Sequence, residues 1–213
     1  MSYFEPGQDL GRDDPPLDRT GVAQAEALGG LLRDVPLELA VHTGMERTLQ
    51  TANLAIAPRT IELVAMEGLS EAKTGSFEEI ETEAEMRSTI VGAFEDAEAP
   101  GARFLTGESY RELWTRVDQA WRELLAGDWR QVFVAAHGVV NRTIIAQALG
   151  AGPEIYRRLE QDTGCLNVLD IEGEGADARV AYVRLLNFTP YNATKAGMHQ
   201  TTLEMLWQQF AGD

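Results

Sequence analysis

The run from Val132 to Ala136 most strongly constrains the fold of this chain. Its five small or apolar residues lead directly into His137 and Gly138, and a helix-like run from Val139 to Leu149 follows. An apolar stretch of this length between turn signals is typical of a strand buried in a parallel sheet. Ligands of open α/β sheets bind outside the carboxyl ends of the strands, which is where His137 falls. The alternative is a core histidine whose ring is satisfied by a neighbouring group.

Further strand-like and helix-like segments alternate along the chain. Asp18 is expected to cap the first helix, and Gly173 to Gly175 read as a hairpin turn. Alternation of this kind predicts one α/β domain over residues 1–213, with helices on both faces of the sheet. The expected helices are 18–33, 46–57, 108–126, 139–149, 154–159 and 202–210, and the expected strands are 37–41, 60–65, 132–136, 165–171 and 179–186.

The segment 76–106 is predicted to begin with a long helix. Ser76 and Glu79 have the spacing of a capping box, and Ala99-Pro100-Gly101 breaks the pattern. The helix is strongly acidic but keeps an apolar face, so its charges are interpreted as a solvated surface. A helical lid that sets substrate specificity is the alternative for residues 76–106.

Composition limits the classes of function. Acidic residues outnumber basic ones by 34 to 18, and a net charge of −16 repels a phosphate backbone, so nucleic acid is not expected as a partner. No apolar run approaches the roughly 20 residues that span a bilayer, so no membrane contact is expected. The single cysteine, Cys165, and a start without a signal peptide favour a reducing cytoplasm.

Arg47 is the first candidate for binding an anion. It opens a helix directly after the strand end His42-Thr43-Gly44, a position where a cation opposes the helix dipole. Beside a bound anion, the guanidinium and the helix N–H groups would converge on the same oxygens. The alternative is a surface salt bridge to an acidic neighbour. His42 and Thr43 could line the same cleft.

Two further strand-to-helix junctions carry candidate residues. Glu71 lies in a loop bounded by glycines, where a carboxyl with a raised pKa could donate a proton, although it could equally be a solvating charge. Gly138 would allow a backbone N–H to approach an anion beside His137. The three histidines, which include His42 and His199, show no metal-ligand spacing, so neither a metal nor a cofactor is expected.

Five stretches resemble, in order, the motifs of the histidine phosphatase superfamily, the relatives of cofactor-dependent phosphoglycerate mutase. The resemblance implies a three-layer α/β/α sandwich with a mostly parallel central sheet. The stretches are Pro16 to Ala25, His42 to Ala52, Leu69 to Gly75, Gly107 to Tyr110 with Arg116 downstream, and Val134 to Arg142.

This resemblance also implies a chemistry. A nucleophilic histidine would form a phosphohistidine, while Arg47 and His137 balance charge on the phosphoryl oxygens and Glu71 serves as proton donor. The implied activity is hydrolysis of a small phosphorylated metabolite. Mutase activity is disfavoured because nothing in the sequence secures a second phosphoryl acceptor. A homodimer is left open.

The chain departs from the family at its start. The family's N-terminal strand ends in Arg-His-Gly or Arg-His-Ala and supplies the nucleophile, whereas no histidine precedes His42 here. We therefore expect that Met1 is an internal codon of a longer reading frame and that a central strand is missing. The alternative is a pseudoenzyme that binds a phosphorylated ligand through Arg47 and His137 without turnover.

Overall fold

The computed structural model describes residues 14–211. Outside the segment 76–99, the helices and strands lie within two residues of the expected bounds. They are α1 (Arg19–Leu31), β1 (Leu39–His42), α2 (Glu46–Ile56), β2 (Glu62–Ala65), α3 (Glu83–Val91), α4 (Tyr110–Leu125), β3 (Val132–Val134), α5 (Gly138–Ala148), β4 (Leu166–Glu172), β5 (Arg179–Phe188) and α6 (Thr202–Ala211). Short 3-10 turns cover Glu67–Leu69, Phe104–Thr106, Pro153–Arg158 and Gly175–Asp177.

A parallel sheet of order β2-β1-β3 forms the middle layer. Val41 of β1 pairs with Val64 on one side and with Val134 on the other, so all three strands end at the same edge. Short parallel strands need crossover connections, and α2 and α4 lie within these connections. The prediction that Val132 begins a parallel strand is confirmed, and within β3 Phe133 is buried while Val132 and Val134 are partly buried.

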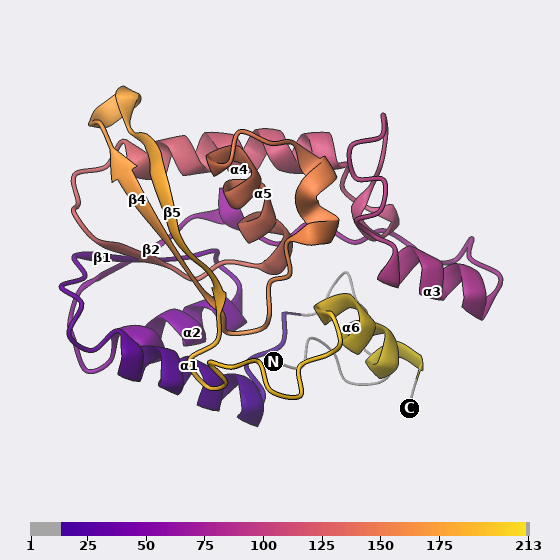
Figure 1. The fold of residues 1–213 in the computed structure, drawn as a ribbon, viewed down its shortest axis with the longest axis horizontal. Helices are drawn as coiled ribbons and strands as arrows, with labels where there is room; N and C mark the ends of the chain where they lie inside the picture. The colour runs from indigo at the N-terminus through magenta and orange to yellow at the C-terminus, as the bar shows by residue number, and fades with distance from the viewer. Residues whose placement is uncertain (1–13, 212–213) are drawn as a thin grey trace.

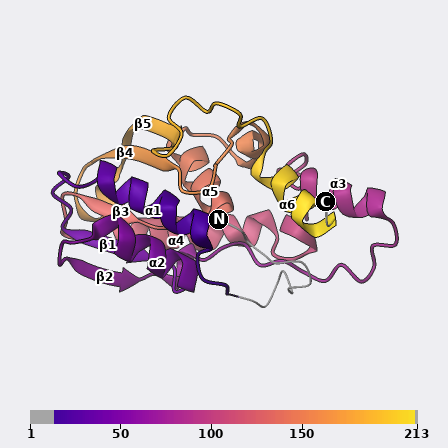
Figure 2. The same cartoon turned by 90° about the horizontal axis from the view of Figure 1, so that it is seen from below.

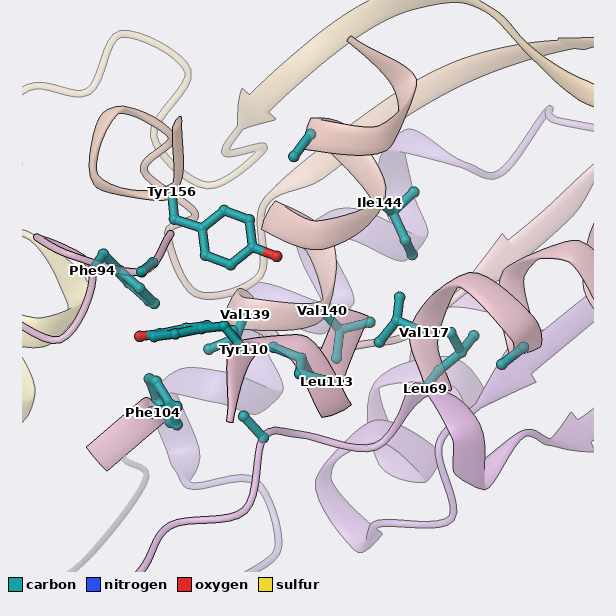
Figure 3. Close-up of a cluster of buried hydrophobic side chains, with 14 of the residues drawn as sticks. Leu69, Phe94, Phe104, Tyr110, Leu113, Val117, Val139, Val140, Ile144 and Tyr156 are labelled. Atoms are coloured by element: carbon teal, nitrogen blue, oxygen red, sulfur yellow. The ribbon is translucent and has the colours of Figure 1, made fainter. Parts of the chain in front are cut away.

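Helices cover both faces of this sheet, as Figures 1 and 2 show. Because neighbouring side chains of a strand point to opposite faces, Ala40 packs with α1 and α2 whereas Val41 packs with α4 and α5. The second of these cores extends into an aromatic cluster, in which the rings of Phe94, Tyr110 and Tyr156 meet edge to face or tilted (Figure 3). The predicted three-layer α/β/α arrangement is confirmed.

The antiparallel hairpin of β4 and β5 forms a second, separate sheet (Figure 1). Within residues 14–211, β3 has a ladder only on its β1 side and β4 only on its β5 side. A cavity of about 1500 Å³ lies between these two edges, against α1 and α5. It is larger than the roughly 300–1,000 Å³ typical of metabolite pockets. Residues on its walls include Leu28, Phe133, Val134, Ile145 and Leu169.

The helix predicted from Ser76 is wrong in its bounds. Thr82 caps α3 and forms the capping box with Glu85, six residues after the expected start. The Ser76 carbonyl accepts a hydrogen bond from the Thr106 hydroxyl at 2.7 Å, so it is drawn into a contact between loops instead of a helical turn. The helix ends at Gly92. Segment 76–91 packs against the C-terminal helix, where Phe77 contacts Phe210, and its role as a lid stays a prediction.

The capping of α1 and its packing on α2 agree with the sequence. Asp18 accepts a hydrogen bond from the Gly21 N–H at 2.6 Å, which confirms the expected N-cap. Gly29 lies so close to α2 that an added Cβ would be 2.5 Å from the Leu54 carbonyl oxygen. The absence of a side chain at Gly29 therefore sets how closely the two helices approach. No helix within residues 14–211 is long and apolar enough to span a membrane.

We predict that Gly29→Ala lowers the free energy of unfolding by about 1–3 kcal/mol, because the new methyl group must push α1 away from the α2 backbone. Gly30→Ala is the matched control, since an added Cβ there meets nothing within 4 Å. Its helix propensity should leave stability unchanged or raise it by up to about 1 kcal/mol. Urea unfolding of both variants checks this, and equal stabilities would contradict the packing argument.

Candidate active site

The carboxyl edge of the parallel sheet brings together the residues singled out in the sequence. Thr43 follows β1, the 3-10 turn leading to Glu71 follows β2, and His137 comes three residues after the end of β3. Because the three strands are parallel and in register, these segments meet at one edge. Arg47, in the first turn of α2, joins them there.

Arg47 is buried, and it holds a carboxylate at the N-terminus of α2. Its Nη1 lies 3.3 Å from Oδ1 of Asp14, while Oδ2 of the same carboxylate accepts the Glu46 N–H at 2.7 Å. Arg47 thus forms the salt bridge that was the alternative to anion binding. The two interpretations share one geometry, because the guanidinium and the helix N–H converge on a single carboxylate as they would on a bound anion. The Asp14 carboxylate thus occupies the position predicted for an anion, and phosphate binding there stays a prediction.

His137 is almost fully buried, and its partners fix its tautomer. Arg47 Nη2 contacts Nδ1 at 3.4 Å, and a guanidinium can only donate, so Nδ1 accepts. The proton of the neutral ring therefore lies on Nε2, which donates to the Thr43 hydroxyl at 2.8 Å. That hydroxyl contacts Thr48 Oγ1 at 3.0 Å, and Thr48 donates to the Met45 carbonyl. The chain of hydroxyls orients the imidazole.

Burial lowers the pKa of His137 well below its ordinary value, and the positive charges of Arg47 and Arg116 lower it further. The site thus holds a neutral imidazole beside a cation. A nearby anion would offset the arginine charge and favour protonation of Nδ1. The alternative of a core histidine satisfied by its neighbours describes the hydrogen bonds correctly, but those neighbours are an arginine and a threonine at the strand ends.

Burial raises the pKa of the Glu71 carboxyl. A hydrogen bond from the Ala72 N–H and the charges of Arg47, Arg142 and Arg116 act in the opposite direction and are weaker. The environment of Glu71 therefore disfavours the charged form of its carboxyl. A raised pKa is what a general acid near neutral pH needs.

The remaining candidates take different positions. The Thr43 side chain is buried and hydrogen-bonded to His137, so it acts on the site by orienting that ring. His42 is partly buried, and its Nδ1 accepts the Gly44 N–H at 3.2 Å. Gly138 begins α5, and a Cβ there would lie 3.2 Å from Arg142 Nη1. Phosphate binding by these three residues, as by Arg47 and His137, stays a prediction.

Sequence reasoning missed several residues of the site. Asp14 lies in a turn-rich stretch without a periodic pattern, and Thr48 is ordinary within a helix. Arg142 was matched as part of a motif but given no role. It is buried and donates to the carbonyls of Gly138 and Tyr156. Within residues 14–211 no group of three or more His, Cys, Asp or Glu side chains could hold a metal ion.

Sequence comparison agrees with the fold. A profile of the histidine phosphatase superfamily (branch 1) matches residues 6–183. The chain belongs to this superfamily.

Three individual proteins illustrate the relationship. The "Probable 2-carboxy-D-arabinitol-1-phosphatase" of Arabidopsis thaliana is 31% identical over 185 residues, covering 85% of this chain. This chain spans only 38% of the length of that relative. The adenosylcobalamin/alpha-ribazole phosphatase of Escherichia coli (strain K12) is 27% identical, and the alignment covers 80% of this chain and 85% of that protein. The alpha-ribazole phosphatase structure from Shigella flexneri superposes with a TM-score of 0.66 at 25% identity, and the superposition covers 83% of this chain and 86% of that chain.

We predict that Arg47→Met raises the pKa of His137, because the cation beside Nδ1 is removed. The pKa should remain below about 6.5, since the ring stays buried. Nitrogen NMR of the ring across pH measures it. Arg33→Met, which removes an exposed cation after α1, should leave the titration unchanged. An unchanged pKa in Arg47→Met would contradict this account of the site.

Proposed function

We propose that this protein is a phosphomonoester hydrolase for small phosphorylated metabolites, acting through a phosphohistidine intermediate. The observation that carries the proposal is the pairing of Arg47 with a carboxylate and the helix N-terminus beside a neutral His137, with Glu71, whose pKa is raised by burial, near the same arginine. The curated relatives named above are phosphatases of phosphorylated organic compounds, which supports the substrate class.

Arg47 and His137 would stabilise the phosphoryl group. A phosphate dianion would take the place of the Asp14 carboxylate between the guanidinium and the Glu46 N–H. The dianion would also favour a proton on Nδ1 of His137, which then donates to a phosphoryl oxygen while Nε2 keeps its bond to Thr43. Preorganised donors of this kind stabilise charge in the transition state.

Glu71 would supply and recover the proton. In the first step the nucleophile attacks phosphorus, the P–O bond breaks, and the Glu71 carboxyl protonates the leaving oxygen. In the second step the resulting carboxylate takes a proton from water, whose oxygen attacks phosphorus as the N–P bond breaks. The sum is one phosphomonoester plus water giving an alcohol plus phosphate.

The nucleophile would come from a strand that precedes the 213-residue chain and fills the cavity between β3 and β4. Both facing edges offer backbone groups for pairing, and the walls are largely apolar. A strand of about five residues parallel to β3 would end beside His137. The chain enters α1 from that side, because Asp14 already lies at Arg47.

The DNA upstream of the first codon tests this strand. We expect in-frame codons for a short apolar segment ending in Arg-His, and we expect the extended protein to hydrolyse 4-nitrophenyl phosphate while the 213-residue chain does not. If no such segment is encoded, the strand proposal fails. Vanadate binding by both forms without hydrolysis by either would instead support a pseudoenzyme, although the relatives named above are phosphatases.

We place the activity in the cytoplasm and expect it to need no metal or nucleic acid. Burial raises the pKa of the Cys165 thiol to about 12, so this thiol is poorly nucleophilic and its role is packing. Activity retained after treatment with a chelator would support the absence of a metal. The state of assembly, with a homodimer as one option, has no bearing on the residues proposed for catalysis.

We predict that Glu71→Gln in the extended protein lowers kcat/KM for an alkyl phosphate by about 100- to 10,000-fold. In the unsubstituted protein, activity should fall as pH rises through the raised pKa of Glu71, because only the protonated carboxyl donates. This fall should disappear in Glu71→Gln. The exposed neighbour Glu67, changed to Gln, is the control and should keep both rate and pH profile. A Glu71→Gln profile that still falls in the same range would overturn the assignment.

A further inference from the structure

The loop that carries Glu71 belongs to no helix or strand, yet it is held by one side chain of α4. Arg116 directs its guanidinium into this loop. Its Nη1 donates to the carbonyls of Gly68 and Ser70 at 3.0 and 2.8 Å, and its Nη2 donates to the carbonyl of Glu71 at 3.1 Å. Three hydrogen bonds from one fixed planar group to carbonyls within four residues determine both the position and the orientation of the loop backbone.

Glu108 fixes Arg116 in turn. Its two carboxylate oxygens accept from Nε and Nη2 of Arg116, both at 2.7 Å. The same residue binds the far end of the loop: its N–H donates to the Lys73 carbonyl at 2.8 Å, and its carboxylate accepts the Lys73 N–H at 3.3 Å. Arg116 and Glu108 together therefore hold the loop on both sides of Glu71, and we call this pair the loop clamp.

Two glycines allow the loop to sit this close. A Cβ at Gly107 would lie 2.0 Å from the Lys73 carbonyl oxygen, and one at Gly68 would lie 2.7 Å from the Cβ of Ala120 on α4. The loop is thus packed against α4 and its preceding turn with no room to shift toward them. The loop clamp and the two glycines therefore restrict the same segment, residues 68–73.

We propose that Arg116 and Glu108 are positioning residues that hold Glu71 where its carboxyl reaches the leaving oxygen of the substrate. This inference rests on the proposed function, since it assigns the pair to the proton transfer of that reaction. Arg116 contacts the carbonyl of Glu71 itself, so a loosened clamp moves the acid directly. Misplacement of a catalytic group by about 1 Å can cost on the order of 100-fold in rate.

The competing explanation is that the ion pair only stabilises the fold. The two explanations differ in their dependence on the leaving group. An alkyl phosphate needs a proton on its leaving oxygen, whereas 4-nitrophenolate leaves without one. The ratio kcat/KM reports the step in which the P–O bond breaks, so a positioning role should affect alkyl phosphates far more than aryl phosphates.

The test compares Arg116→Met, Arg116→Lys and Glu108→Gln in the extended protein. We expect Arg116→Met to lose about 100-fold in kcat/KM on an alkyl phosphate and less than about 5-fold on 4-nitrophenyl phosphate. Arg116→Lys keeps the charge but loses the planar fork, so it should show the same selective loss. Arg122→Met removes an exposed cation of the same helix and should change neither rate. Equal losses on both substrates would overturn the proposal.

Hydrogen exchange on the 213-residue chain gives a second readout that needs no catalysis. Amide exchange across residues 71–75 should speed up in Arg116→Met and Glu108→Gln and stay unchanged in Arg122→Met, with circular dichroism confirming that each variant is folded. Unchanged exchange in the clamp variants would overturn the clamp. If the unsubstituted extended protein hydrolyses neither phosphate, the proposed function fails, and exchange alone decides whether the loop is clamped.

Discussion

The contact of the Arg47 guanidinium with the imidazole of His137 is the interaction on which the rest of this site depends. A buried cation is costly unless it is paired, and here its partners are a neutral ring and the carboxylate of Asp14. The guanidinium forces Nδ1 to accept, and this places the ring proton on Nε2 and recruits Thr43 and Thr48 as a supporting chain. Arg47 thus sets the tautomer of its neighbour, the hydroxyl chain orients the ring, and burial together with the arginine charge keeps it neutral.

Burial acts in opposite directions on the two titratable groups of the site. It disfavours the charged form of each, so it lowers the pKa of His137 and raises that of Glu71. The fixed positive charges near the two groups are those of Arg47, Arg116 and Arg142, and they are paired with the carboxylates of Asp14, Glu108 and Glu160 respectively. In a protein with a net charge of −16, a small anion would have to displace such a carboxylate partner to reach a guanidinium.

The sequence predicted those parts of the structure that local rules govern. An apolar run before His137 predicted a strand, and Asp18 predicted a helix start, because side-chain periodicity and capping are local. Ser76 shows the limit: its spacing to Glu79 imitates a capping box, but a hydrogen bond from Thr106, thirty residues away, takes its carbonyl. The contact of the Asp14 carboxylate with Arg47 was equally beyond prediction, because it depends on the path of the chain before α1.

Two features of the molecule meet at one place and support a single explanation. The edge of β3 beside the cavity has no ladder within residues 14–211, and both ring nitrogens of His137 are engaged by Thr43 and Arg47, so this ring is poorly placed to attack phosphorus. A pseudoenzyme would account for the second feature but would leave the cavity unexplained. A strand parallel to β3 would pair the free edge and bring a new side chain to Arg47 from the open side. The unpaired sheet edge and the need for a nucleophile therefore favour the same missing element.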